Sequence, residues 1–133
     1  MAPAKTYLVP IDFSPGSEIA LKHALDLARK EKGKLLLVHV LPLVLPLATV
    51  KEIVRREIEA IAERLRLNRD EYRLLIVERP NAARAIAALA KKSGASMIIM
   101  GTQGKTGLQR LVLGSVAERT LRYADCPVLI VKK

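Results

Sequence analysis

Five short apolar runs recur along this chain of 133 residues, and the stretches between them have helical periodicity. The runs are mostly continuous in Leu, Val and Ile rather than alternating, which is typical of strands buried on both faces. They span residues 7–13, 35–40, 72–77, 97–100 and 127–131, and the helical stretches span 17–32, 48–67, 81–93 and 115–123. Strand and helix in alternation predict right-handed crossovers and helices on both faces of a parallel sheet. We therefore expect an α/β fold with one open, doubly wound, five-stranded parallel sheet.

The length fits a single domain over residues 1–133, large enough to bury a core without disulfides or metal. Cys126 is the one cysteine, and the two histidines, His23 and His39, are too far apart for a zinc motif. Because a single cysteine has no partner for a disulfide within the chain, we assume a reducing compartment and expect a cytoplasmic protein. The N-terminus lacks the apolar core of a secretory signal, and the most apolar segment, 35–50, is too short and proline-interrupted to span a membrane.

The formal net charge of +10 would suit nucleic acid or another polyanion. In the second helical stretch, however, the charges alternate in sign, with Glu52 and Arg56 four residues apart as on a solvated helix face. Aromatic residues make up only 3% of the chain, which leaves little for stacking unpaired bases. A solvated basic surface is favoured over a dedicated nucleic-acid site, and small anions remain suitable ligands.

Polar residues and glycines follow the predicted strands where ligands collect in an open parallel sheet, beyond the strands' carboxyl ends. Asp12 and Ser14 follow the first run, a loop from Leu41 follows the second, and Gly101 follows the fourth. We expect Asp12 to contact a ligand there, with capping of the first helix as the alternative. His39 lies inside an apolar run and is interpreted as a core histidine with a hydrogen-bond partner.

Four of the seven glycines fall between positions 101 and 114, at 101, 104, 107 and 114. The tripeptide 104–106 is Gly-Lys-Thr, but a P-loop requires another glycine at the position that Ile99 occupies. The spacing also differs from the G-x-G-x-x-G fingerprint of dinucleotide sites. Neither of these two phosphate motifs is present.

A different phosphate site fits the spacing. Gly101 and Gly104 allow the backbone to approach a ligand closely, and "SVAE" predicts a helix with Ser115 as its N-cap and Glu118 completing a capping box. The free N–H groups of that helix terminus would bind an anion. From spacing alone, simple turns at these glycines are an equally good explanation.

The pattern Gly101-x-x-Gly104, nine residues, then Gly114-Ser115 resembles the ATP-binding motif of the universal stress protein family. The segment "VPIDFSPGSEIAL" resembles the first strand and helix start of that family, and the likeness extends along the whole chain. The resemblance implies the strand order 3-2-1-4-5, ATP with Mg²⁺ or Mn²⁺ as ligand, and a homodimer built on the last strand. It also implies nucleotide contacts from a set of residues at the strand ends and in the glycine loop: Asp12, Ser14, Val40, Gly101, Thr102, Gly104, Lys105, Gly114, Ser115 and Val116.

Two features depart from the family pattern: Gln103 stands where a basic or imidazole side chain is common, and Pro80 and Ala82 replace a Gly and a Pro. Lys105 is as readily interpreted as a solvated loop lysine as a phosphate ligand. The sequence offers no evident base for hydrolysis. We therefore expect an ATP-binding stress-response sensor or regulator with weak hydrolysis at most. A slow ATPase and a basic nucleic-acid-binding protein with an incidental nucleotide site are the alternatives.

Overall fold

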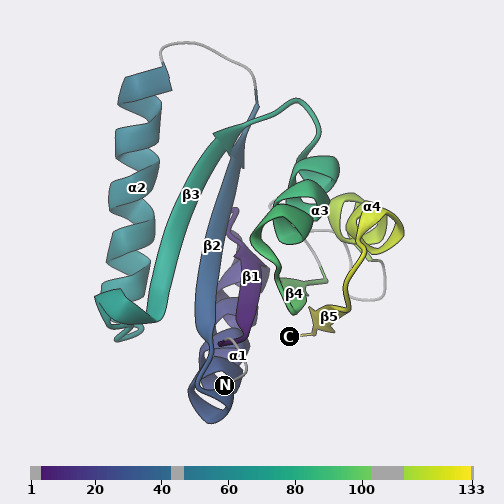
Figure 1. Cartoon of the computed structure of the whole chain (residues 1–133). Helices are drawn as coiled ribbons and strands as arrows, with labels where there is room; N and C mark the ends of the chain where they lie inside the picture. The colour runs from purple at the N-terminus through teal and green to yellow at the C-terminus, as the bar shows by residue number, and fades with distance from the viewer. Residues whose placement is uncertain (1–3, 43–46, 103–112, 133) are drawn as a thin grey trace.

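The structure is a computed structural model that describes residues 4–42, 47–102 and 113–132 (Figure 1). Within these residues, five parallel strands form one sheet in the order β3-β2-β1-β4-β5. The strands are β1 (Thr6–Pro10), β2 (Lys34–Leu41), β3 (Tyr72–Glu78), β4 (Met97–Gly101) and β5 (Val128–Val131). The predicted α/β class and the strand order 3-2-1-4-5 are confirmed.

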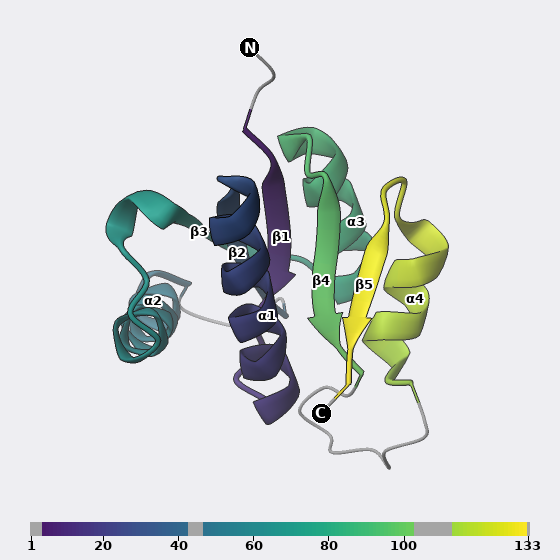
Figure 2. The same ribbon diagram turned by 90° about the horizontal axis from the view of Figure 1, so that it is seen from below.

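Helices cover both faces of the sheet, as expected for crossovers of one hand. They are α1 (Pro15–Glu31), α2 (Leu47–Arg64), α3 (Ala82–Ser93) and α4 (Ser115–Tyr123), with a short 3-10 helix η1 (Arg69–Glu71) before β3. Figures 1 and 2 show α3 and α4 side by side next to β4 and β5. α1 and α2 cover the opposite face, with α2 against β3.

Alternate side chains of the central strands pack into two separate hydrophobic cores, one on each face of the sheet. Tyr7 and Val9 of β1 pack with α1 and α2, whereas Leu8 between them packs with α3 and α4. Leu8, Leu36 and Ile98 are fully buried at 0% exposure. This burial on both faces explains why the strands are continuous apolar runs in the sequence.

The first helix begins two residues earlier than the sequence predicts. Ser14 is its N-cap, and the Ser14 hydroxyl accepts a hydrogen bond from the Ser17 N–H at 3.1 Å. Pro15 occupies the first helical position, where its missing N–H costs nothing and its fixed φ suits the helix. The helix start therefore lies close to the end of β1.

The predicted N-cap of the last helix was wrong by one residue. Gly114, with φ −60° and ψ 154°, is the N-cap of α4, and its carbonyl oxygen accepts from the Glu118 N–H at 2.9 Å. Ser115 is therefore the first helical residue, and no side chain caps this terminus.

An ion pair fixes the far end of α1 to the segment that leads into β3. Arg29 donates to both carboxylate oxygens of Glu71, at 2.8 and 3.0 Å, and to the carbonyl oxygen of Arg66. The hydrogen bond from Arg29 lowers the pKa of Glu71 to about 2, against the opposing effect of partial burial. This contact holds α1 in register against the β3 side of the sheet.

Candidate functional site

A pocket opens at the carboxyl ends of β1, β2 and β4, where the winding direction of the sheet reverses. This is the place where open α/β sheets bind ligands. One wall is apolar and comes from the three strands and from the first turns of α3 and α4: Pro10, Ile11, Val38, Val40, Ala82, Ile86, Met100, Val116 and Ala117. A slot with such a lining suits a flat, largely apolar ring.

The polar residues of the pocket come mainly from the β1–α1 turn and the start of α4. They are Asp12, Ser14, Ser17, His39 and Ser115, together with the glycines Gly101 and Gly114. The pocket thus has an apolar region and a polar rim, which is the division that a nucleoside phosphate requires.

Hydrogen bonds within the β1–α1 turn fix its shape. Asp12 Oδ1 accepts from the Ser14 N–H at 3.0 Å and from the Ser14 hydroxyl, which in turn accepts from the Ser17 N–H. Ser14 is only 3% exposed, so its hydroxyl serves the turn. The hydrogen bonds that the structure gives for the Asp12 carboxylate all involve Oδ1, which leaves Oδ2 available to a ligand. Capping and ligand contact are therefore compatible at Asp12.

His39 supports the same turn from β2. Its Nδ1 lies 2.6 Å from the carbonyl oxygen of Ile11. Because a carbonyl only accepts, Nδ1 carries the proton in this contact. The imidazole also packs against Phe13, with the ring centres 5.1 Å apart, and Phe13 has the left-handed φ of 66°. The predicted hydrogen-bond partner of His39 is confirmed, but the predicted core position is wrong, because His39 is half-buried and lines the pocket.

Gly101 is required by packing between β4 and α1. A Cβ at this position would lie 2.7 Å from the carbonyl oxygen and 2.8 Å from the carbonyl carbon of Gly16. Both contacts are with backbone atoms, which cannot rotate away as the end of a flexible side chain would. The glycine therefore brings the end of β4 against the first turn of α1, and both elements line the pocket.

The N-terminus of α4 differs from those of α1 and α3 at this edge of the sheet. Side chains cap α1 through Ser14 and α3 through Asn81, whose Oδ1 accepts from the Arg84 N–H at 3.1 Å. At α4 the N-cap is Gly114, which has no side chain to accept a hydrogen bond. The N–H groups of the first three residues of α4 have no hydrogen-bond acceptor among the described residues, and they carry the positive end of the helix dipole.

Most of the predicted site residues that the structure describes lie around this one pocket. The residues that line it are Asp12, Ser14, Val40, Gly101, Gly114, Ser115 and Val116. Thr102 does not line it, although its carbonyl oxygen accepts from the Gly114 N–H at 2.6 Å and so joins the end of β4 to the start of α4. Gly104 and Lys105 lie outside the described residues.

The sequence analysis missed the part of the wall that α3 supplies. Ala82 and Ile86 line the pocket, yet Ala82 was noted only as a departure from a family pattern and Ile86 was not named. The available signal was topological, because the helix after β3 must also start at the carboxyl edge of the sheet.

Neither a metal cluster nor a reactive thiol was found in residues 4–42, 47–102 and 113–132. These stretches contain no group of three or more His, Cys, Asp or Glu side chains that is able to hold an ion. Burial, and secondarily the charge of Asp125, raises the pKa of the Cys126 thiol. The searched helices also include none with the length and apolar character needed to cross a membrane.

Comparison with known proteins agrees with this architecture. The model of the universal stress protein family matches residues 3–132. The universal stress protein MJ0531 of Methanocaldococcus jannaschii is 34% identical over 140 aligned residues, which cover 97% of this chain and 82% of the relative.

Two solved structures extend the comparison to the fold. The structure of MJ0577, another universal stress protein of M. jannaschii, superposes with a TM-score of 0.78 at 29% identity and covers 97% of this chain and 96% of that one. A universal stress protein of Archaeoglobus fulgidus in complex with dAMP has a TM-score of 0.75 at 22% identity, with coverage of 99% and 100%. At that identity the second structure supports the fold alone. From the family match and the shared architecture, the chain belongs to the universal stress protein family.

Proposed function

We propose that the pocket binds ATP and that the protein is a nucleotide-dependent sensor or regulator of the stress response. The observation that carries the proposal is the uncapped N-terminus of α4 at the rim of an apolar slot. Free N–H groups at a helix start bind phosphate directly, and the helix dipole adds attraction for negative charge.

Each part of the nucleotide has a matching part of the pocket. The adenine ring fits between the ends of β1 and β2 and the first turn of α3, against Val40 and Ile86. Asp12 Oδ2 is placed to accept from a ribose hydroxyl, and the phosphates lie toward Gly114 and Ser115. Mg²⁺ or Mn²⁺, when present, is held mainly by the phosphates, because the described residues offer Asp12 and no cluster of further ligands.

An adenine nucleotide has been seen bound to a protein of the same fold. The A. fulgidus protein with the same fold was solved with dAMP, which shares the adenine ring and a phosphate with ATP. The family match and the α4 terminus together favour a ligand with a phosphate chain over a free nucleoside.

A pair of serine substitutions tests the role of the α4 terminus. Ser115→Asp adds a carboxylate at the first helical position, where it favours the helix by about 0.3–1 kcal/mol but repels phosphate. Ser96→Asp adds the same charge before β4, at the amino edge of the sheet. We expect Ser115→Asp to bind ATP at least tenfold more weakly in calorimetric titration while unfolding at the same or a higher temperature. Equal ATP affinities of the two variants would contradict the proposed phosphate position.

Gly114→Val provides an independent test by bulk rather than charge. The φ and ψ of Gly114 lie in the extended region that any residue adopts, so valine is compatible with the backbone. We expect a folded protein that no longer binds ATP, because the side chain occupies the space over the α4 N–H groups. A folded variant with unchanged ATP affinity would remove this residue from the site.

A further inference from the structure

The net charge is divided very unevenly along the chain. Residues 79–133 contain ten of the 23 basic side chains but only two of the 13 acidic ones, so they contribute +8 of the net +10. The described part of this segment, residues 79–102 and 113–132, forms α3, β4, α4 and β5, which lie together on one side of the molecule (Figure 2). The alternating charges of the segment that forms α2 gave no sign of this division, yet in the fold the described residues up to 78 carry a net +2 and those beyond carry a net +5.

Five exposed cations gather on the paired helices of the basic half, and we call them the α3–α4 basic face: Arg84, Lys91, Lys92, Arg119 and Arg122. On α3, Arg84, Lys91 and Lys92 fall within an arc of about 100°, with Lys92 roughly 12 Å along the helix from Arg84. The two helices are joined through this face, because Arg84 stacks over the Tyr123 ring at 4.4 Å and Lys91 lies 3.7 Å from Asp125.

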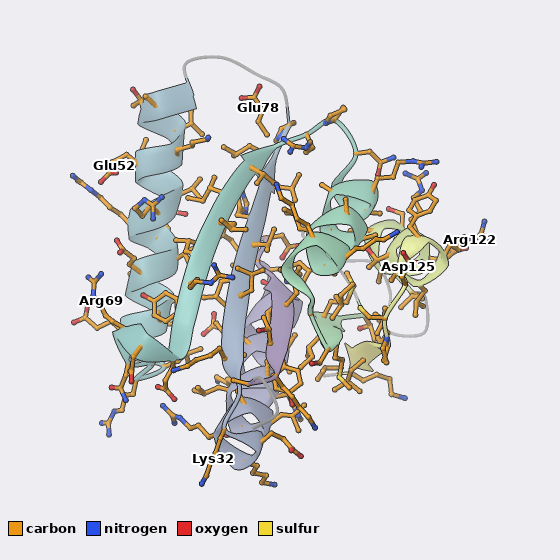
Figure 3. The ribbon with its side chains drawn as sticks, viewed as in Figure 1. Lys32, Glu52, Arg69, Glu78, Arg122 and Asp125 are labelled. Atoms are coloured by element: carbon orange, nitrogen blue, oxygen red, sulfur yellow. The ribbon has the colours of Figure 1, made fainter. Side chains whose placement is uncertain are left out.

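The first 78 residues offset their positive charges more completely, with 11 acidic side chains for 13 basic ones. Five of the seven ion pairs among the described residues join partners within the first 78 residues. On the basic face the acidic partners are Glu118 and Asp125 alone, paired with Arg122 and Lys91. Lys92 and Arg119 form no ion pair with described residues. Figure 3 shows Arg122 on the outer side of α4, away from the sheet.

We propose that the α3–α4 basic face binds the phosphate backbone of double-stranded DNA without reading its sequence. A duplex carries one negative charge per about 1.7 Å of its axis, so a stretch as long as the twelve-residue α3, about 18 Å, presents about ten phosphates. Lysine and arginine side chains on a helical surface are sufficient for such contacts, which fix position and not sequence.

The side chains between the cations favour a duplex over other polyanions. A single strand is held by stacking on aromatic faces, and the ring of Tyr123 is already covered by Arg84. A protein partner needs a buried apolar anchor and a membrane needs apolar side chains to insert, whereas the exposed stripe of α3 adds only Ala88 to its cations. The exposed Leu121 lies about 160° around α4 from Tyr123, on the flank away from α3.

Two triple variants, each of which removes three positive charges, distinguish DNA binding by this face from DNA binding by the overall net charge. Lys91, Lys92 and Arg119 are replaced by Gln in one variant, and Lys22, Lys30 and Arg55, exposed on α1 and α2, in the matched control. Neither set lines the nucleotide pocket. Binding is measured by fluorescence anisotropy of a labelled 24-base-pair DNA duplex of mixed sequence between about 50 and 200 mM salt.

We expect the wild type to bind the duplex with a dissociation constant of about 10⁻⁴–10⁻⁶ M, in the usual range for sequence-independent contacts. The face variant should bind at least tenfold more weakly, and its salt dependence should fall by up to about 2.7 in log–log slope, since each lost phosphate contact removes about 0.9. The control should stay within about twofold of the wild type. Circular dichroism monitors folding. Should the triple variant unfold, Lys92→Gln with Arg119→Gln tests the same face, with a slope change of up to about 1.8.

Several results overturn the proposal. The first is an equal loss of duplex affinity in the two triple variants, and the second is the absence of duplex binding by the wild type at about 50 mM salt. The third is face-dependent binding of a single strand of the same length that is tighter than binding of the duplex. Tighter face-dependent binding of vesicles with phosphatidylserine, or of polyglutamate, would likewise assign the face to another partner.

Discussion

Gly101→Ala tests whether the contact between β4 and α1 shapes the nucleotide pocket. The new Cβ would meet the carbonyl oxygen and carbon of Gly16 at 2.7 and 2.8 Å. Both atoms belong to the backbone of α1, so the first turn of the helix must shift to make room. Overpacking of this kind costs about 1–3 kcal/mol of folding free energy. The shift also moves Ser14, whose hydroxyl bonds to Asp12, so we expect ATP affinity to fall at least fivefold.

Gly94→Ala is the matched control, because it strains the backbone without a collision. Gly94 ends α3 with φ +69°, and a Cβ there meets nothing within 4 Å. A left-handed alanine costs about 1–2 kcal/mol, so the control is destabilised to a similar degree while its ATP affinity stays unchanged. Urea unfolding gives the two stabilities and calorimetry gives the two affinities. Wild-type stability in Gly101→Ala, or equal ATP affinities in the two variants, would refute the reasoning.

Three further predictions concern hydrolysis, assembly and pH. Steady-state phosphate release at saturating ATP should be far below the ~10 per second of a typical enzyme, and a rate of that size that Ser115→Ala abolishes would show catalysis. The edge strand β5, with Leu129 41% exposed, should pair with a second copy. The molecular mass from light scattering should therefore exceed the 14.6 kDa of one chain, and Leu129→Pro should dissociate the dimer. A wild-type mass of one chain at micromolar concentration would contradict the pairing. Because the pKa of Glu71 is lowered to about 2, its ion pair stabilises the fold above about pH 4.5 and is lost as the pH falls toward 2. Glu71→Gln should thus be about 1 kcal/mol less stable at neutral pH, after allowance for solvent screening, with the difference closing in acid unfolding curves; a difference that persists at pH 2 would reject this origin.

The sequence predicted the architecture because burial on both faces leaves a direct mark in the residues. Strands β2, β3 and β4 are within one residue of their predicted bounds at either end. Most residues of β2 and β4 are buried, whereas the edge strand β3 buries only Ile76 and is marked by its apolar run alone. β1 ends three residues earlier than predicted, because the apolar Ile11 and Phe13 belong to the turn, where Phe13 takes a positive φ and packs against His39.

The site could be predicted only in part, because its contacts join elements that are distant in sequence. The positions of Asp12 and Gly114 follow from strand ends and glycine spacing. Nothing local indicates that Gly101 meets Gly16, or that His39 supports the turn after β1 through the carbonyl of Ile11. The division of charge between the two halves was readable from the sequence, but only the fold shows that it corresponds to a face.

A calorimetric comparison of ATP with adenosine tests the central claim most directly. The phosphates are proposed to bind at the uncapped N-terminus of α4 and the adenine ring at the apolar wall of the pocket. We therefore expect one ATP bound per chain and an adenosine affinity at least tenfold lower, which corresponds to about 1.4 kcal/mol from the phosphate contacts. Equal affinities for the two ligands, or no binding of either, would contradict it.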